Sequence, residues 1–256
     1  NISNELPDGR VTLSVDGKLN VSIKSEKGDY DLKGMTPEEF PALPELDEQS
    51  EVTIPSELLK TIIQTTSFAI SSDELKPALT GVLFQFKDGG LTTVATDGHR
   101  LARYHIKEFE ATGFSGDIII PRKFLSLSKN LLGKKETVEM QIGKNHITVT
   151  FGDDTVHSRI IDERYPDYES VIPTNNDKTL TINTQEIIST VRRVSIFSNR
   201  TTQQIAIKMD KEALEITTED PEKARRAKEK INGEYSGEPI VIGYNALYLK
   251  ELLSYI

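Results

Sequence analysis

The stretch "SGDIIIPRKFLSLSKNLL", residues 115–132, has a counterpart in "SGEPIVIGYNALYLKELL", residues 236–253. Both stretches begin with Ser-Gly, continue as a short apolar run and end with Leu-Leu. Two further pairs of segments repeat in this way: residues 51–71 with 179–199, and residues 21–41 with 147–167. The repeat length is roughly 120 to 130 residues, which is the size of a domain and too long for a solenoid repeat. The sequence therefore predicts a chain built from one repeated domain.

The elements of the repeated unit follow from its residue pattern. Alternation over 51–54 predicts an opening strand, and Ser56 in one copy and Thr184 in the other are candidate N-caps of a first helix. Short alternating strands with Gly and Asp turns come next. Pro121 marks the entry to a second helix, because proline is tolerated only in the first turn. Residues 137–161 are predicted to form two closing strands.

This pattern divides the chain into one complete unit and two incomplete ones. Residues 1–46 hold only closing strands, residues 47–173 form a whole unit, and residues 174–256 lack the last strands of a third unit. A unit without its last strands would expose an unpaired sheet edge, so we expect the natural protein to be longer at both ends. The fold class is α+β, with two helices packed on antiparallel sheets in each domain.

Composition narrows the possible functions. The 256 residues carry a net charge of −9, whereas a nucleic-acid binder is usually basic, although an acidic exterior can enclose a basic lining. The sequence has no cysteine, so disulfides and thiolate metal sites are excluded. No apolar run reaches the ~18 residues that a membrane span needs. We expect no cofactor.

The polar stretch "TVATDGHRLARY", residues 93–104, is a candidate active site or a tight turn. Asp97-Gly98 between two alternating runs is a strong hairpin signal, and His99 has no neighbour at metal-ligand spacing. The pair Asp153-Asp154 resembles the carboxylates that hold metals in nucleotidyl transferases, but it also lies where a hairpin turn is needed. The turn is favoured in both cases.

The remaining motifs indicate a binding or scaffold protein. No phosphate-binding loop, dinucleotide-binding loop or nucleophile elbow occurs, and the mixed charges of residues 219–230 predict a solvated loop or helix face. The alternative function is a metal-dependent nucleotidyl-transfer enzyme or nuclease that uses Asp153 and Asp154.

Three segments together carry a resemblance to a known family. "VATDGHRLARY" (94–104), "IIIPRKFL" (118–125) and "ERYPDYESVIP" (163–173) closely resemble the bacterial DNA polymerase sliding clamp, the beta subunit of the replicative polymerase. The resemblance covers the whole chain and implies a non-catalytic processivity factor, grouped with DNA-directed DNA polymerases only by association. It also implies ring-forming DNA-clamp domains, with helices lining the hole, and a cytoplasmic, nucleoid-associated location.

The family binds short apolar peptides of the polymerase, the clamp loader and repair proteins in a groove between the second and third domains. Carried over by position, the resemblance implies these groove residues: Leu79, Thr96, Gly98, His99, Arg100, Leu101, Pro166, Ser170, Val171, Thr202, Asn245 and Tyr248. Ser170 and Thr202 are small where larger residues often occur in relatives. Plain core packing is the alternative for Leu79, Leu101 and Val171.

Two further surfaces follow from the resemblance. Sequence-independent contacts to duplex DNA are expected from basic residues on or near the helices: Lys60, Lys76, Arg122, Lys123, Lys129, Arg192, Arg193, Arg200 and Lys250. Each of them is otherwise a solvated surface charge. A head-to-tail homodimer of the full-length protein is expected to close through Tyr30 and Leu32 on one side and Ile196 and Phe197 on the other; otherwise these four belong to their own domain cores.

Overall fold

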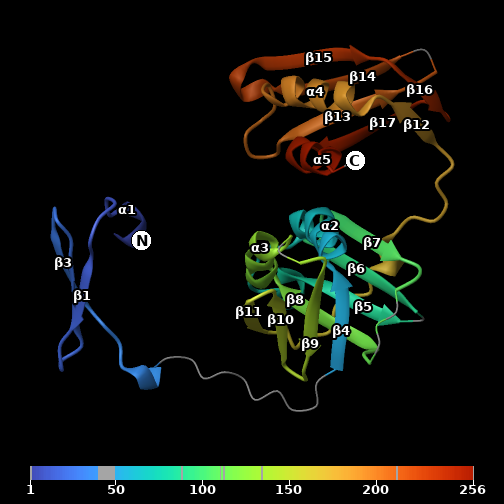
Figure 1. The fold of residues 1–256 in the computed structure, drawn as a ribbon. Helices are drawn as coiled ribbons and strands as arrows, with labels where there is room; N and C mark the ends of the chain where they lie inside the picture. Colours follow the sequence, from blue (N-terminus) through green and yellow to red (C-terminus); the bar gives the residue numbers. More distant parts are fainter. Residues whose placement is uncertain are drawn as a thin grey trace. The chain divides into compact units, whose positions relative to one another are not determined.

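A computed structural model describes residues 2–39, 50–87, 89–109, 111, 113–133, 135–211 and 213–255. The chain divides into two compact units, Asn1–Glu45 and Leu46–Ile256 (Figure 1). Both are mixtures of short helices and antiparallel sheets, so the α+β fold class is confirmed. Among the described helices, none combines the length and the apolar content that crossing a lipid bilayer requires.

The first unit is built around one three-stranded antiparallel sheet. Its elements are α1 (Ile2–Glu5), β1 (Thr12–Val15), β2 (Asn20–Lys24), β3 (Asp29–Lys33) and the 3-10 turn η1 (Pro37–Glu39). The Asp16 carboxylate accepts the backbone N–H groups of Lys18 and Asn20 and so closes the first hairpin. The segment holds strands, as the sequence predicts, and also the short helix α1, which the sequence does not predict.

The second unit begins with two four-stranded sheets and two helices. These elements are β4 (Ser50–Pro55), α2 (Ser56–Thr66), β5 (Gly81–Lys87), β6 (Gly90–Thr96), β7 (Leu101–Ile106), β8 (Gly116–Pro121), α3 (Arg122–Leu131), β9 (Thr137–Ile142), β10 (His146–Phe151) and β11 (Asp154–Arg159). One sheet has the order β11-β10-β9-β4 and the other β7-β6-β5-β8. Helices α2 and α3 lie side by side (Figure 1), and their apolar faces join the inner faces of both sheets in one core around Ile62, Phe84 and Met140.

The rest of the second unit repeats this plan. Its elements are β12 (Thr179–Ile182), α4 (Thr184–Ser195), β13 (Gln204–Met209), β14 (Leu214–Asp220), β15 (Arg225–Ile231), β16 (Gly233–Ser236), β17 (Ile240–Asn245) and α5 (Ala246–Leu253). The order β15-β14-β13-β17 matches β7-β6-β5-β8 strand for strand, and β12 pairs with β16. A separate core around Val191, Ile205 and Ile216 lies beneath α4 and α5. The internal repeat predicted from the sequence is therefore confirmed.

The predicted N-caps were wrong by one residue. Asn183 caps α4, and its side chain accepts the backbone N–H of Glu186 at 3.0 Å, so Thr184 is the first helical residue. Pro55 precedes α2 without a side-chain cap, and the Ser56 hydroxyl instead donates to the Lys135 carbonyl at 2.6 Å. An amide side chain at the position before the helix outcompetes a hydroxyl one residue later, because only the earlier position is free of helical geometry.

Two other local predictions also need correction. Residues 137–161 hold three strands rather than two, because the loop at Gly143 and the turn at Gly152 each reverse the chain. The mixed-charge run 219–230 is neither a loop nor a helix face throughout, since its second half, residues 225–230, belongs to β15, the edge strand of its sheet. Charged side chains on an edge strand discourage pairing with other chains. An edge strand can therefore have the same residue composition as a solvated loop or helix face.

We predict that Asn183→Ala lowers the free energy of unfolding by about 1 kcal/mol, because the N–H of Glu186 loses its acceptor at the start of α4. Thr184→Ala is the matched control and should change the free energy by less than about 0.5 kcal/mol. Urea unfolding followed by far-ultraviolet circular dichroism measures both. Equal effects of the two substitutions would contradict the assignment of the cap.

Candidate functional site

The loop between β6 and β7 confirms the predicted hairpin and gives its Asp a structural task. Asp97 Oδ1 accepts the backbone N–H of His99 at 2.9 Å and that of Arg100 at 3.0 Å, while Gly98 adopts a φ of +88° that favours glycine. Burial by itself would raise the pKa of Asp97, but these two donors and the Arg100 guanidinium outweigh burial and lower the pKa. The carboxylate therefore stays charged and holds the loop in one shape.

Arg100 joins this loop to two distant segments. Its Nε donates to Asp97 Oδ2 at 3.1 Å, its Nη1 to Glu251 Oε2 at 2.6 Å and its Nη2 to the Phe68 carbonyl at 2.7 Å. The guanidinium carbon also lies 4.7 Å from the centroid of the Tyr248 ring. One side chain thus connects the hairpin, the turn after α2 and the helix α5.

Three of the residues expected in the groove, Leu79, Leu101 and Val171, differ in burial. Leu79 is buried, as core packing would have it, and Leu101 packs half-buried against an apolar cluster that includes Leu83 and Tyr168. Val171 lies in the 3-10 turn η4 (Glu169–Val171) and is 68% exposed. Plain core packing is therefore wrong for Val171, and its apolar side chain is available to a partner.

The expected groove residues near α5 come together in two groups. The Tyr248 ring contacts both Arg100 and, at 5.9 Å between centroids, His99. Asn245 caps α5 by accepting the backbone N–H of Tyr248, and its Nδ2 donates to the Thr202 carbonyl at 3.4 Å. Thr96 and Gly98 belong to the hairpin loop itself: Thr96 Oγ1 donates to the Arg100 carbonyl at 2.7 Å and accepts the backbone N–H of Gly98 at 3.1 Å. Among the described side chains, no hydrogen bond or ring contact links Pro166, Ser170 or Val171 to the hairpin loop.

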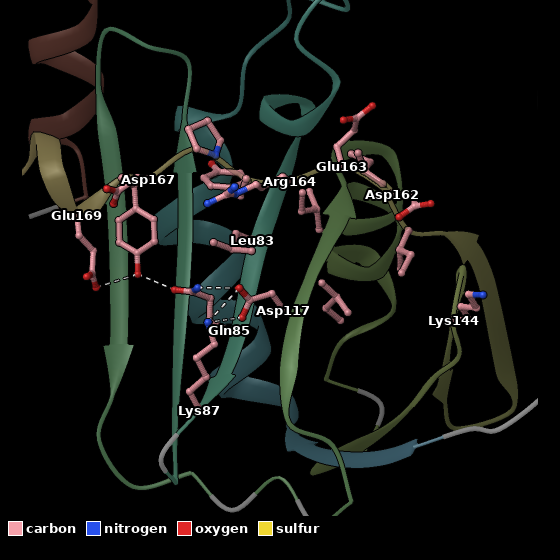
Figure 2. A pocket seen from close by; sticks show the side chains of 17 residues that line it. Leu83, Gln85, Lys87, Asp117, Lys144, Asp162, Glu163, Arg164, Asp167 and Glu169 are labelled. Atoms are coloured by element: carbon pink, nitrogen blue, oxygen red, sulfur yellow. Dashed lines mark hydrogen bonds and ion pairs between the residues drawn. The ribbon is translucent and has the colours of Figure 1, made fainter.

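A cavity of about 720 Å³ lies under the segment that leads to Val171 (Figure 2). Its wall carries a chain of hydrogen bonds: the Tyr168 hydroxyl donates to Gln85 Oε1 at 2.6 Å, and Gln85 Nε2 donates to Asp117 Oδ2 at 3.0 Å. Lys87 Nζ lies 2.9 Å from the same Asp117 carboxylate. Burial raises the pKa of Tyr168, so its hydroxyl keeps the proton that it donates. This network fixes the segment against β5 and β8.

The basic residues expected to contact DNA fall into two groups. Three of them already have partners: Lys60 Nζ lies 3.3 Å from Glu57, the Arg193 guanidinium pairs with Glu229, and the Arg122 guanidinium donates to the Ile70 carbonyl. The others form no ion pair with a described residue: Lys76, Lys123, Lys129, Arg192, Arg200 and Lys250. The positive charges of the second group are therefore available to bind phosphates.

A hollow between α4 and α5 gathers residues from two of the expected surfaces. Its volume is about 830 Å³, and Arg192, Lys250 and Ile196 all line it. Ile196 follows directly after α4 and is 69% exposed, and Phe197 is also exposed. Neither side chain belongs to the core of its own domain.

Tyr30 and Leu32 of β3 are exposed in the same way. They face Ile23 and Val21 across the strand pair β2–β3. The alternative that the four expected dimer residues are core residues is therefore wrong.

The candidate metal residues lie in turns or on sheet surfaces. Gly152 and Asp153 form the two-residue turn between β10 and β11, with Gly152 at a φ of +70°. His105 Nδ1 lies 2.8 Å from the Thr92 hydroxyl across the hairpin β6–β7. In the part of the chain that the structure describes, no group of three or more His, Cys, Asp or Glu side chains is placed to hold a metal ion.

Several residues at this site were missed by sequence reasoning. Glu251, Phe68 and Tyr255 all contribute to the contacts around Arg100, and the Phe68 and Tyr255 rings stack with centroids 4.7 Å apart. Phe68 and Tyr255 lie far apart in the sequence of the second unit, and no local sequence pattern indicates a role for either residue. Glu251 reads as an ordinary charged residue of a helix.

Comparison with known proteins finds one family. The family model described as "DNA polymerase III beta subunit, central domain" matches residues 53–167, and that of the C-terminal domain matches residues 169–256. A beta sliding clamp of Salmonella typhimurium is 31% identical over 97% of this chain and 68% of its own length. The beta sliding clamp of Bacillus subtilis is 30% identical over 98% of this chain and 68% of its own length.

A solved structure agrees in fold as well as in sequence. The sliding clamp of Bartonella birtlesii bound to griselimycin is 30% identical, covers the whole of this chain with 70% of its own and has a TM-score of 0.89. The similarity extends across both units and both cores. The chain therefore belongs to the beta sliding clamp family, and it functions as a sliding clamp, a non-catalytic beta subunit of DNA polymerase III.

Proposed function

We propose that the full-length protein closes head to tail as a two-chain ring around duplex DNA and tethers its partners through one peptide groove. The partners are the replicative polymerase, the clamp loader and repair proteins, and the setting is the bacterial cytoplasm at the nucleoid. The proposal divides the chain into the end of a first domain (1–46), a second domain (47–173) and most of a third (174–256).

The contact of His99 and Arg100 with Tyr248 carries the groove proposal. It brings the hairpin of the second domain against α5 of the third, beside the apolar cluster that includes Leu101. Apolar surface with a few fixed polar groups suits a short apolar peptide. Burial of two large side chains supplies roughly 3 to 6 kcal/mol before the cost of ordering. Micromolar affinity needs about 8 kcal/mol, so polar contacts of the groove have to supply the rest.

Charge supports loose contact with DNA. The chain has a net charge of −9, yet Arg192 and Lys250 line one hollow between α4 and α5. A few long cations that neutralise phosphates give weak, sequence-independent and salt-sensitive binding. Weak binding suits a protein that has to slide along the duplex.

For the groove, we predict that Val171→Asp weakens binding of a fluorescein-labelled Gln-Leu-Gln-Leu-Phe peptide at least about tenfold, because a carboxylate would be buried without a partner. Val241→Asp is the matched control, since Val241 is 63% exposed and Val171 is 68% exposed. Fluorescence anisotropy measures both affinities. Leu101→Asp should also weaken binding severely, but its half-buried position makes a check of folding necessary. Unchanged affinity in Val171→Asp and Leu101→Asp would place the peptide site elsewhere.

For DNA, we predict that Arg192→Ala lowers affinity for a short duplex and reduces the slope of log affinity against log salt by about 0.9, the contribution of one phosphate. Arg193→Ala should have a smaller effect on affinity, because Glu229 already compensates its charge. Lys208→Ala on the exposed face of β13 is the charge-matched control. Anisotropy titrations at several salt concentrations test this, and a salt-independent or sequence-dependent affinity would contradict the sliding mode.

For the ring, we predict that the full-length protein is a dimer and that Ile196→Ala with Phe197→Ala converts it to monomers. Both side chains are exposed in the single chain, so their loss removes contact area without opening a core. Leu127→Ala, at a residue that is 49% exposed on α3, is the control. Light scattering gives the mass, and a double variant that remains dimeric would show that the ring closes through another surface.

A further inference from the structure

All three nitrogens of the Arg100 guanidinium are already engaged within the chain. Nε donates to Asp97, Nη1 to Glu251 and Nη2 to the Phe68 carbonyl, at 3.1, 2.6 and 2.7 Å. The rings of Phe68 and Tyr248 lie 5.4 and 4.7 Å from the guanidinium carbon. Only 14% of the side chain is exposed. Three of the five N–H donors of Arg100 are thus used within the chain, and its side chain is mostly covered.

The electrostatics of Arg100 favour this fixed arrangement. Burial by itself would lower the pKa of Arg100, but the carboxylates of Glu251 and Asp97 outweigh burial and raise the pKa. The planar guanidinium offers donors in a fixed fork and a face for aromatic rings, whereas a lysine ammonium offers a single point of charge. An arginine at position 100 can therefore hold several partners at once.

Arg100 contacts Tyr248 and Glu251 of α5, and its neighbour Phe68 contacts Tyr255. Tyr248 lies in the first turn of the helix, Glu251 follows one turn later, and Tyr255 comes after the helix ends. The Tyr255 ring stacks on Phe68 with an angle of 13° between the planes, so the end of α5 is held as well. Helix α5 is thus held at its first turn, one turn later and just after its end.

We propose that Arg100 is a positioning residue: with Glu251 it sets the position of α5 relative to the hairpin loop, and thereby the spacing of the two sides of the peptide groove. This inference rests on the proposed groove. It assigns a role in partner binding to Glu251, which lies outside the expected groove set. It also means that Arg100 acts on the peptide through Tyr248 and α5 rather than by direct contact.

A double-mutant cycle in the 256-residue chain tests the proposal. The variants are Arg100→Lys, Glu251→Gln and both together, and the readout is anisotropy of the fluorescein-labelled Gln-Leu-Gln-Leu-Phe peptide. We expect Arg100→Lys to weaken binding about tenfold and Glu251→Gln about threefold to fivefold. The double variant should resemble Arg100→Lys alone, because the two residues act through one contact. Glu57→Gln, which removes a carboxylate from the pair with Lys60, is the control and should bind normally.

Hydrogen exchange provides a readout that general destabilisation would not reproduce. Arg100→Lys should speed exchange of amides in α5 and in residues 98–100, which are far apart in sequence, while amides in β9 and β10 keep their rates. Faster exchange throughout the second unit would overturn the positioning role, because it would indicate loss of the fold instead. Faster exchange that is confined to amides of the hairpin loop would also overturn the positioning role, since α5 would then not depend on Arg100.

The outcomes separate this proposal from the groove itself. Normal peptide affinity in Glu251→Gln together with weak affinity in Arg100→Lys would mean that Arg100 contacts the peptide directly, and would overturn the positioning role. If Val171→Asp and Leu101→Asp both bind the peptide normally, the groove is wrong. In that event, the hydrogen-exchange link between the hairpin loop and α5 still tests whether Arg100 positions the helix.

Discussion

Burial of one face of each amphipathic helix against antiparallel sheets is the constraint on which the second unit depends. In α2 the buried positions Leu59, Ile62 and Ile63 recur at helical spacing, and in α4 Ile187, Val191 and Val194 do the same. The opposite face of each helix is then free for polar and basic residues. This is why a chain with a net charge of −9 can gather Arg192 and Lys250 in one hollow beside its helices. Net charge describes solubility and long-range attraction, whereas local placement decides which surface meets a phosphate.

The hairpin loop has a structural role and a proposed binding role at once. Asp97 shapes the loop through its two backbone donors, and Arg100 connects the loop to α5. Ordinary turn chemistry therefore explains Asp97 and Gly98 without any catalysis. The same rigidity is what a binding surface needs, because a loop held in one shape loses little entropy when a peptide binds. A stretch that resembled an active site is better understood as a fixed edge beside an apolar cluster.

Much of the fold could be predicted from the sequence because its signals are local or repeated. The repeat of residues 115–132 in 236–253 identified β8–α3 and β17–α5 as equivalent, and the Asp-Gly pair at 97–98 predicted the hairpin. The predictions that were wrong concern places where the local sequence allows more than one structure. Asn183 and Thr184 are adjacent candidates for the cap of α4, and the structure selects Asn183. The charges of β15 predict a solvated loop or helix face, because they leave no apolar alternation that would indicate a strand.

The candidate site divides along the same line. By itself the sequence determined the repeated α+β domain, the hairpin and the family, because all three depend on residues that are close in the chain or on copies of one pattern. Only the tertiary structure decided that Arg100 is occupied by Glu251 and Phe68, that Arg193 is compensated by Glu229, and that Ile196 and Val171 are exposed. Those facts depend on which side chains meet after the sheets and helices pack. The sequence gives the type of a charged or apolar residue, but it does not show whether that residue is paired, buried or exposed.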